Sequence, residues 1–205
     1  MSLFSIIIGL GASLALLRLA LASDESTRLK TLLMGLLVQG GALIGARLAF
    51  VLAHLTYFAA RKNEMLNLRA GGLWWPGAVT GGLIAILLIG IARKHQVRQA
   101  LDQFSVFLLP MAVSFWIASW SAGVAYGARL DPSVWWGIPI LDINGVSLPR
   151  VPVQPAAALT LFLILGTIEW RMKKQLPKGR RMGILLLATA AYTLVFSLMR
   201  DDPVQ

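Results

Sequence analysis

The sequence lacks cysteine and contains few charged residues, and both features narrow the class of protein to which it can belong. Without cysteine the chain cannot form disulfides, thiolate metal sites or a palmitoyl anchor. Charged residues make up only 14% of the 205 residues, hydrophobic residues make up 57%, and the mean hydropathy is +0.72. A soluble domain of this length could not bury that much apolar surface. The composition therefore indicates a membrane protein.

Six apolar stretches approach the length of a membrane span, which takes roughly 20 residues at ~1.5 Å per residue. They lie at residues 2–22, 31–60, 73–92, 104–125, 153–170 and 182–199. The second is long enough to tilt or to contain a break near Gly40 and Gly41. We therefore expect an all-α polytopic membrane protein with about six transmembrane helices, or seven. Residues 1–205 would form a single membrane domain.

Basic residues are concentrated between alternate helices. The net charge is +10, and most of the 19 lysines and arginines lie at 28–30, 93–98 and 171–181. By the positive-inside rule these segments face the cytoplasm, so both termini and the loop 126–152 would lie outside. This loop has turn residues and tryptophans, and we expect it to lie flat on the outer headgroups. The basic surplus indicates anionic lipid as the partner, not nucleic acid.

The start of the chain also resembles a cleavable leader in one respect. Residues 20–22, Ala-Leu-Ala, have the small-residue pattern of a signal-peptide cleavage site. No basic residue precedes the apolar run, so we expect the first helix to be retained.

The second helix carries the most informative polar residues: Gly40, Arg47 and His54 are spaced seven apart and share nearly one face. A guanidinium near mid-span costs at least ~2.5 kcal/mol on insertion scales. The acids Asp102 and Glu169 fall near helix ends. Two partners remain for Arg47: a lipid phosphate, which the planar guanidinium binds bidentately, or the backbone carbonyls of a broken neighbouring helix.

His54 could act as a base, as a haem ligand or as a packed residue that supports Arg47. The other histidine, His95, lies in a basic segment between helices, which excludes bis-histidine haem ligation within this chain. A lone membrane histidine is more often packed than catalytic, so His54 is a weak catalytic candidate.

Residues 71–82, GGLWWPGAVTGG, begin the third helix with five glycines. The small residues Gly72, Gly77, Gly81 and Gly82 allow close helix approach or an irregular entry into the membrane. Proline is tolerated in a first turn, and the paired tryptophans are typical interface anchors.

The order of these features resembles the prolipoprotein diacylglyceryl transferase family, bacterial enzymes that move diacylglyceryl from phosphatidylglycerol to a lipoprotein cysteine. Residues 45–52, GARLAFVL, resemble the family pattern Gly-Gly-Arg-Ile-Gly-Tyr-Val-Leu, and residues 71–82 resemble its Gly-Gly-Met-Ser-Phe-His-Gly-Gly segment. Residues 150–154, RVPVQ, resemble Arg-His-Pro-Ser-Gln, and 183–200 fit the last helix. Further matches are Asp102, Pro110, Gly123, Tyr126 and Gly127.

The chain departs from the family where the family's chemistry is done. Replacements stand at a histidine (Pro76), an arginine (Trp116), an asparagine (Ser119), an outer-loop histidine (Val151) and a tyrosine, arginine and glutamate of the last helix (Thr189, Thr193, Ser197). Transfer needs a base for the thiol and cations for the leaving phosphate. These replacements supply neither, so whether the chain is an enzyme stays open at this point.

Two functions follow from the resemblance and its departures. The first is a catalytically degenerate relative that binds phospholipid or serves as an accessory subunit of a membrane complex. The alternative is an active phosphatidylglycerol-prolipoprotein diacylglyceryl transferase, acting in lipoprotein biosynthesis through a rearranged site. The resemblance implies bound phospholipid, no metal or other cofactor, and a place in the bacterial inner membrane. Candidate ligands of the lipid phosphate are Arg47, Arg150, Gln154 and Arg200.

Overall fold

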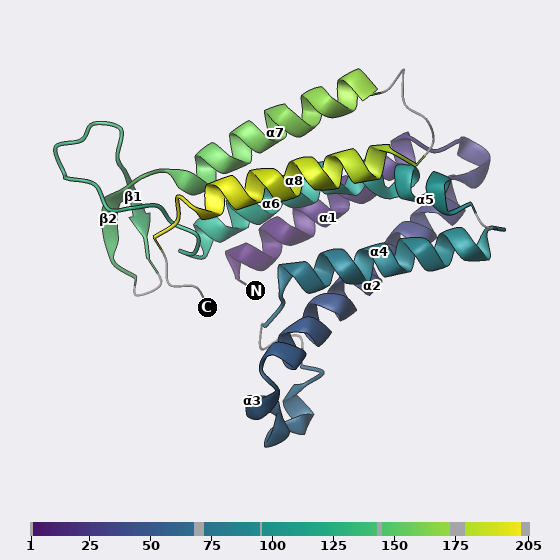
Figure 1. Cartoon of the computed structure of the whole chain (residues 1–205), viewed down its shortest axis with the longest axis horizontal. Helices are drawn as coiled ribbons and strands as arrows, with labels where there is room; N and C mark the ends of the chain where they lie inside the picture. The colour runs from purple at the N-terminus through teal and green to yellow at the C-terminus, as the bar shows by residue number, and fades with distance from the viewer. Residues whose placement is uncertain (1, 68–71, 95, 143–144, 173–178, 202–205) are drawn as a thin grey trace. The chain divides into compact units, whose positions relative to one another are not determined.

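The computed structural model describes residues 2–67, 72–94, 96–142, 145–172 and 179–201, and these are mostly helical (Figure 1). The helices are α1 (Leu3–Leu21), α2 (Arg28–Ala53), α3 (Leu55–Ala59), α4 (Trp75–Ala92), α5 (Val97–Phe104), α6 (Leu108–Ser121), α7 (Val153–Met172) and α8 (Arg181–Ser197). Two short strands are β1 (Ile138–Leu141) and β2 (Ser147–Arg150).

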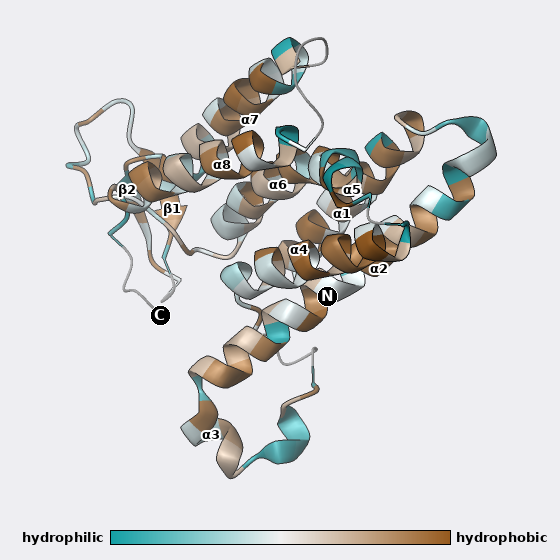
Figure 2. Ribbon diagram, turned by 45° about the vertical axis from the view of Figure 1, so that its right-hand side comes forward, coloured by the Kyte–Doolittle hydropathy of each residue, from teal (hydrophilic) through white to brown (hydrophobic). Residues whose placement is uncertain are grey.

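Within the described residues, five helical stretches are long and apolar enough to cross a membrane. They are Leu3–Leu21, Glu25–Ala53, Trp75–Ala92, Val97–Ser121 and Val153–Met172, and α8 is a shorter apolar helix. Large apolar side chains remain exposed along these helices, for example Leu37 at 64% and Leu187 at 73%. Figure 2 shows the same pattern, with brown apolar residues along the helices and hydrophilic teal residues in the turn after α3. The predicted all-α polytopic membrane fold is confirmed.

The chain divides into two compact units, which we describe separately. Unit 1 comprises Met1–Arg18 and Ser105–Gln205, and unit 2 comprises Leu19–Phe104. In unit 1, α6, α7 and α8 pack around an apolar core that includes Trp116, Leu161, Leu165 and Leu185. The strands β1 and β2 pair antiparallel, with Ile138 opposite Arg150 and Leu141 opposite Ser147. This hairpin lies beyond the ends of α7 and α8 (Figure 1).

Unit 2 is built on a close crossing of α2 and α4. A Cβ placed on Gly45 would lie 2.7 Å from Gly81 Cα, and one on Gly41 would lie 3.0 Å from the Gly81 carbonyl oxygen. Only glycine allows two helix backbones to approach this closely, as small-residue motifs do in membranes. The close helix approach predicted from Gly77 and Gly81 is confirmed.

The break considered near Gly40 and Gly41 is wrong. Helix α2 runs through both glycines and ends at Ala53. The next residue, His54, has a φ of −122° and a ψ of 38°, which are not helical. A glycine inside a helix still makes the backbone hydrogen bonds, and the missing Cβ of Gly41 allows contact with α4 instead.

The segment predicted as a flat loop at 126–152 contains the β1–β2 hairpin. Asp142 Oδ1 accepts a hydrogen bond of 2.9 Å from the Val146 amide, and Gly145 closes the turn at a φ of 76°. An Asn-Gly pair between short apolar runs is a strong hairpin signal, and Asn144-Gly145 provides it here, although Asn144 lies outside the described residues.

Candidate functional site

Arg47 is buried in unit 2, with only 5% of its surface exposed. Its guanidinium donates hydrogen bonds to three main-chain carbonyl oxygens: from Nε to Met65 at 2.7 Å, from Nη1 to Gly72 at 3.2 Å, and from Nη2 to Glu64. These bonds hold Glu64, Met65 and Gly72 against α2. The second partner expected for Arg47 was the backbone of a broken neighbouring helix; the carbonyls observed are main-chain oxygens too, but they belong to the turn after α3 and to Gly72. The binding of a lipid phosphate by Arg47 stays a prediction.

The surroundings of Arg47 explain one of the glycines of residues 71–82. Gly72 has a φ of +71°, and a Cβ there would lie 2.8 Å from Arg47 Nη1 and 2.6 Å from Phe50 Cδ1. Both the backbone conformation and the close approach require glycine. The Arg47 guanidinium also lies over the rings of Phe58, at 5.3 Å, and Phe50, at 5.8 Å.

His54 lies at the exposed end of α2. Its Nδ1 is 2.9 Å from the Phe50 carbonyl oxygen, and its ring centroid is 4.3 Å from that of Phe50. Phe50 thus lies between His54 and Arg47 in this chain of contacts. The catalytic role of His54 stays a prediction.

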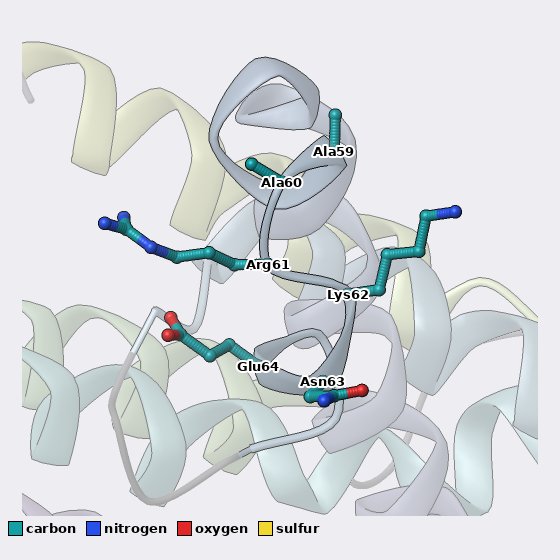
Figure 3. Close-up of a pocket in the computed structure, with 6 residues that line it drawn as sticks. All are labelled: Ala59, Ala60, Arg61, Lys62, Asn63 and Glu64. Carbon is teal, nitrogen blue, oxygen red and sulfur yellow. The ribbon is translucent and has the colours of Figure 1, made fainter.

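An open pocket of about 530 Å³ lies beside the turn that follows α3 (Figure 3). It is lined by Ala59, Ala60, Arg61, Lys62, Asn63 and Glu64. The Arg61 guanidinium lies 4.5 Å from the Tyr57 ring, and the Tyr57 hydroxyl donates to Glu64 Oε2 at 2.9 Å. These contacts order the pocket wall without bringing a base and a nucleophile together.

Arg150, the last residue of β2, is the buried arginine of unit 1, with 6% of its surface exposed. Its Nη2 lies 3.4 Å from Asp142 Oδ2, and its Nη1 lies 3.4 Å from the Gly127 carbonyl oxygen and 3.7 Å from Asp201 Oδ2. Among the described residues, Nε has no hydrogen-bond partner. Charge-assisted bonds are typically about 2.7–2.9 Å, so this guanidinium is loosely held.

Three segments of unit 1 converge at Arg150. Val151 N donates to the Ala128 carbonyl at 2.9 Å, and Gly127 forms an isolated antiparallel bridge with Arg200. A Cβ on Gly127 would lie 2.8 Å from the Val151 Cβ, so glycine is needed for this approach. The Arg150 guanidinium lies 4.2 Å from the Tyr126 ring. We call this convergence of residues 124–129, β2 and 199–201 the Arg150 site.

Gln154 lies next to the Arg150 site, which includes Arg200. Gln154 is fully buried, and its Nε2 donates to the Val124 carbonyl at 3.0 Å. Its Oε1 has no hydrogen-bond partner among the described residues. Arg200 is exposed. Arg150, Gln154 and Arg200 thus lie in unit 1, where each contacts the segment 124–127, whereas Arg47 lies in unit 2.

The positions at which the resemblance predicts lost catalytic side chains are buried or half-buried, except Ser197. Trp116 is 2% exposed, and its ring centroid lies 6.0 Å from that of Phe196. Ser119 is buried, and Thr189 Oγ1 donates to the Leu185 carbonyl of its own helix at 2.7 Å. Pro76 lies in the first turn of α4, Val151 and Thr193 are half-buried, and Ser197 is exposed.

Sequence reasoning missed an ion cluster in unit 1. Arg18 of α1 pairs with the buried Glu169 of α7 and donates to the Val106 carbonyl at 3.1 Å, and Arg181 Nη2 lies 3.9 Å from Glu169 Oε1. The sequence did contain a signal for this pair, because Arg18 and Glu169 both lie near helix ends that the positive-inside rule places at the cytoplasmic side. In the described part of the chain, no group of three or more metal-ligating side chains occurs.

Comparison with known proteins agrees with the resemblance seen in the sequence. The family model described as prolipoprotein diacylglyceryl transferase matches residues 1–205. The chain is similar to proteins named phosphatidylglycerol-prolipoprotein diacylglyceryl transferase from three bacteria. It is 26% identical over 167 residues to that of Cupriavidus necator, covering 78% of this chain and 59% of the relative. It is 28% identical over 171 residues to that of Pseudoalteromonas translucida, covering 80% and 61%. It is 27% identical over 171 residues to that of Pasteurella multocida, covering 80% and 60%.

The chain thus spans about three fifths of the length of the curated relatives it matches. The family match covers both units described above, including Arg47 and the Arg150 site. Together with the apolar helices, it indicates a multi-pass protein of the bacterial inner membrane. This chain belongs to the prolipoprotein diacylglyceryl transferase family.

Proposed function

We propose that this chain binds the phosphate of an anionic phospholipid at the Arg150 site and does not transfer diacylglyceryl. The observation that carries the proposal is the state of the Arg150 guanidinium. It is 6% exposed, its nearest oxygens lie at 3.4 Å, and its Nε has no hydrogen-bond partner among the described residues. A buried charged group with such long contacts is undersatisfied, which is costly unless a ligand completes its bonds.

A phosphodiester matches what the Arg150 site offers. Phosphate oxygens accept bidentate bonds from a guanidinium, and the backbone of the exposed Arg200 bridges Gly127, whose carbonyl contacts Arg150. Gln154 Oε1 is a buried acceptor that a headgroup hydroxyl could satisfy. The relatives are named for phosphatidylglycerol, whose headgroup has both a phosphate and hydroxyls.

The lack of transfer is proposed from the side chains at the replaced positions. Deprotonating a thiol needs a base, and the leaving glycerol phosphate needs cations. Trp116 and Ser119 are buried and offer neither. Removing a single electrostatic donor already costs about 10²–10³ in rate. We therefore propose a phospholipid-binding accessory role in a larger membrane assembly.

An active transferase is the second candidate function. It is favoured by the family match over residues 1–205 and by the names of the relatives. In that case His54 and the arginines would have to act from a rearranged site. Arg47 stays a candidate phosphate ligand in either case, but a phosphate there would compete with three main-chain carbonyls.

Lipid binding is tested by native mass spectrometry of the protein extracted in mild detergent. We expect retained phosphatidylglycerol, at least tenfold less of it on Arg150→Gln and Arg150→Lys, and no change on Arg61→Gln, which removes an exposed charge of unit 2. Equal lipid on all four proteins would refute the Arg150 site.

Transfer is tested separately, by expressing the chain in a bacterium depleted of its own transferase. We expect no restoration of growth, with a functional relative as the positive control. Restored growth would establish the second candidate function.

A further inference from the structure

The Arg150 guanidinium faces two carboxylates whose surroundings differ sharply. Asp142 and Arg150 have side chains that are 9% and 8% exposed, and their charged atoms lie 3.4 Å apart. The side chain of Asp201 is 57% exposed, and its Oδ2 lies 3.7 Å from Arg150 Nη1. Two negative groups therefore share one buried positive group.

Asp142 also stabilises the turn of the β1–β2 hairpin. Its Oδ1 accepts from the Val146 amide at 2.9 Å, and its carbonyl accepts from the Gly145 amide at 3.0 Å, so it closes the hairpin turn. Besides its pairing with Arg150, Asp201 is held through its backbone, by a bond of 2.9 Å from its amide to the Tyr126 carbonyl and by the adjoining bridge of Arg200 to Gly127. Asp201 is thus the carboxylate that can leave without unfolding the hairpin.

We infer that residues 199–201 form an acidic latch, in which the Asp201 carboxylate holds the position on Arg150 that a phosphate group takes when it binds. This inference rests on the proposed function and adds a competitor for its site. Phosphate binding would release the Asp201 side chain to water and loosen the bond between the Asp201 amide and Tyr126.

The energetics favour such an exchange. An ion pair with one exposed partner contributes little, because water screens it. A phosphate that makes two short bonds to the same guanidinium gains more, and Asp142 stays in place as the structural partner. Binding of phosphate and closure of the latch are mutually exclusive, so weakening the latch must strengthen phosphate binding.

The first test measures the affinity of delipidated protein in detergent for three soluble probes: short-chain phosphatidylglycerol, short-chain phosphatidylcholine and glycerol phosphate. Asp201→Asn removes the latch charge, and Asp131→Asn is the control because Asp131 is exposed and its carboxylate accepts hydrogen bonds from Ser133, away from Arg150. We expect Asp201→Asn to lower the Kd for phosphatidylglycerol by about two- to fivefold, in line with the weakness of exposed pairs. Asp131→Asn should match the wild type.

The three probes distinguish the source of the phosphate. A similar gain for glycerol phosphate would show that the latch competes with any phosphate ester, whereas a gain for phosphatidylglycerol alone would show that the lipid chains are required. Both results support the latch. An unchanged or higher Kd for phosphatidylglycerol on Asp201→Asn would overturn the latch and leave the proposed function standing. If no variant bound phosphatidylglycerol, both would fail.

The second test follows the latch itself by hydrogen exchange at the Asp201 amide. We expect exchange to speed up when phosphatidylglycerol is added to the wild type, and to be fast in Asp201→Asn without lipid. An exchange rate that lipid does not change would overturn the inference even if the lipid binds.

Discussion

Two buried arginines of this chain look alike in the sequence but are held in different ways. Arg47 and Arg150 are 5% and 6% exposed. Arg47 donates to three uncharged main-chain oxygens, those of Glu64, Met65 and Gly72, and its bond to Met65 is 2.7 Å long. Arg150 has two carboxylates near it, but within the described residues its guanidinium makes no hydrogen bond or ion pair shorter than 3.4 Å.

On our proposal, this difference separates a structural arginine, Arg47, from an exchangeable one, Arg150. The main-chain oxygens of Glu64, Met65 and Gly72 cannot leave Arg47 without a movement of the backbone that carries them. The Asp201 side chain can leave Arg150 by a local movement, because most of it is already exposed. Burial and charge alone therefore do not identify a ligand site; the identity and the distance of the partners do.

The largest effect is expected for Arg47→Gln. Losing the guanidinium leaves the carbonyls of Glu64, Met65 and Gly72 without these donors, and hydrogen bonds to charged groups contribute about 1.5–3 kcal/mol each. We expect the free energy of unfolding in detergent to fall by at least about 3 kcal/mol. Arg61→Gln, an exposed change in the same unit, should alter it by less than about 0.5 kcal/mol. Similar values for the two variants would remove the contrast between the arginines.

The next effect concerns the glycine crossing that supports the Arg47 region. Gly45→Ala places a methyl group about where the Gly81 backbone lies, 2.7 Å from its Cα, and overpacking of this kind costs about 1–3 kcal/mol. Gly40→Ala on the same helix meets nothing within 4 Å and should be neutral or slightly stabilising. Thermal unfolding of the two variants gives the comparison, and equal stability would mean that the helices do not cross at these glycines.

A smaller effect on stability is expected for Arg150→Lys. The lysine keeps the charge near Asp142 but cannot form the bidentate contact of a guanidinium. We expect at most about 1 kcal/mol of destabilisation, because the contacts of Arg150 are long, together with a clear loss of phosphatidylglycerol affinity. A loss of stability as large as that of Arg47→Gln would make Arg150 a structural arginine too.

The smallest effect is expected at Asp131, whose carboxylate is fully exposed and accepts hydrogen bonds from the Ser133 hydroxyl, at 2.6 Å, and amide, at 2.9 Å. The bond from the Ser133 hydroxyl, and to a smaller extent the bond from its amide, lower the pKa of Asp131 below its usual value. Because the pKa is lowered in the folded state, the associated stabilisation is present above the unfolded-state pKa and disappears as the pH falls through the folded-state value. Ser133→Ala should raise the Asp131 pKa toward the ordinary value, measured by NMR titration of the carboxyl group. An unchanged pKa would show that the hydroxyl bond does not form.

Much of the helical architecture could be predicted from the sequence, because apolar runs of membrane length and glycine pairs have direct structural meanings. The approach of α2 and α4 at Gly45 and Gly81 follows from such residues. The hairpin was missed because its strands are only four residues long, although Asn144-Gly145 is a recognisable signal.

The candidate site was harder to predict, for a physical reason. The sequence identifies an arginine in an apolar setting but not which oxygens fold back onto it. The main-chain partners of Arg47 come from 17 to 25 residues away, and Asp201 lies far along the chain from Arg150. Such partners depend on how loops return to the helices, which hydropathy does not describe.

The most direct test of phosphate binding at Arg150 is an experimental structure of the protein in nanodiscs that contain phosphatidylglycerol. We predict density for a phosphate within hydrogen-bond distance of the Arg150 guanidinium, with Asp142 in place and the Asp201 carboxylate displaced. An Arg150 still held by both carboxylates, with the lipid phosphate bound elsewhere or absent, would contradict it.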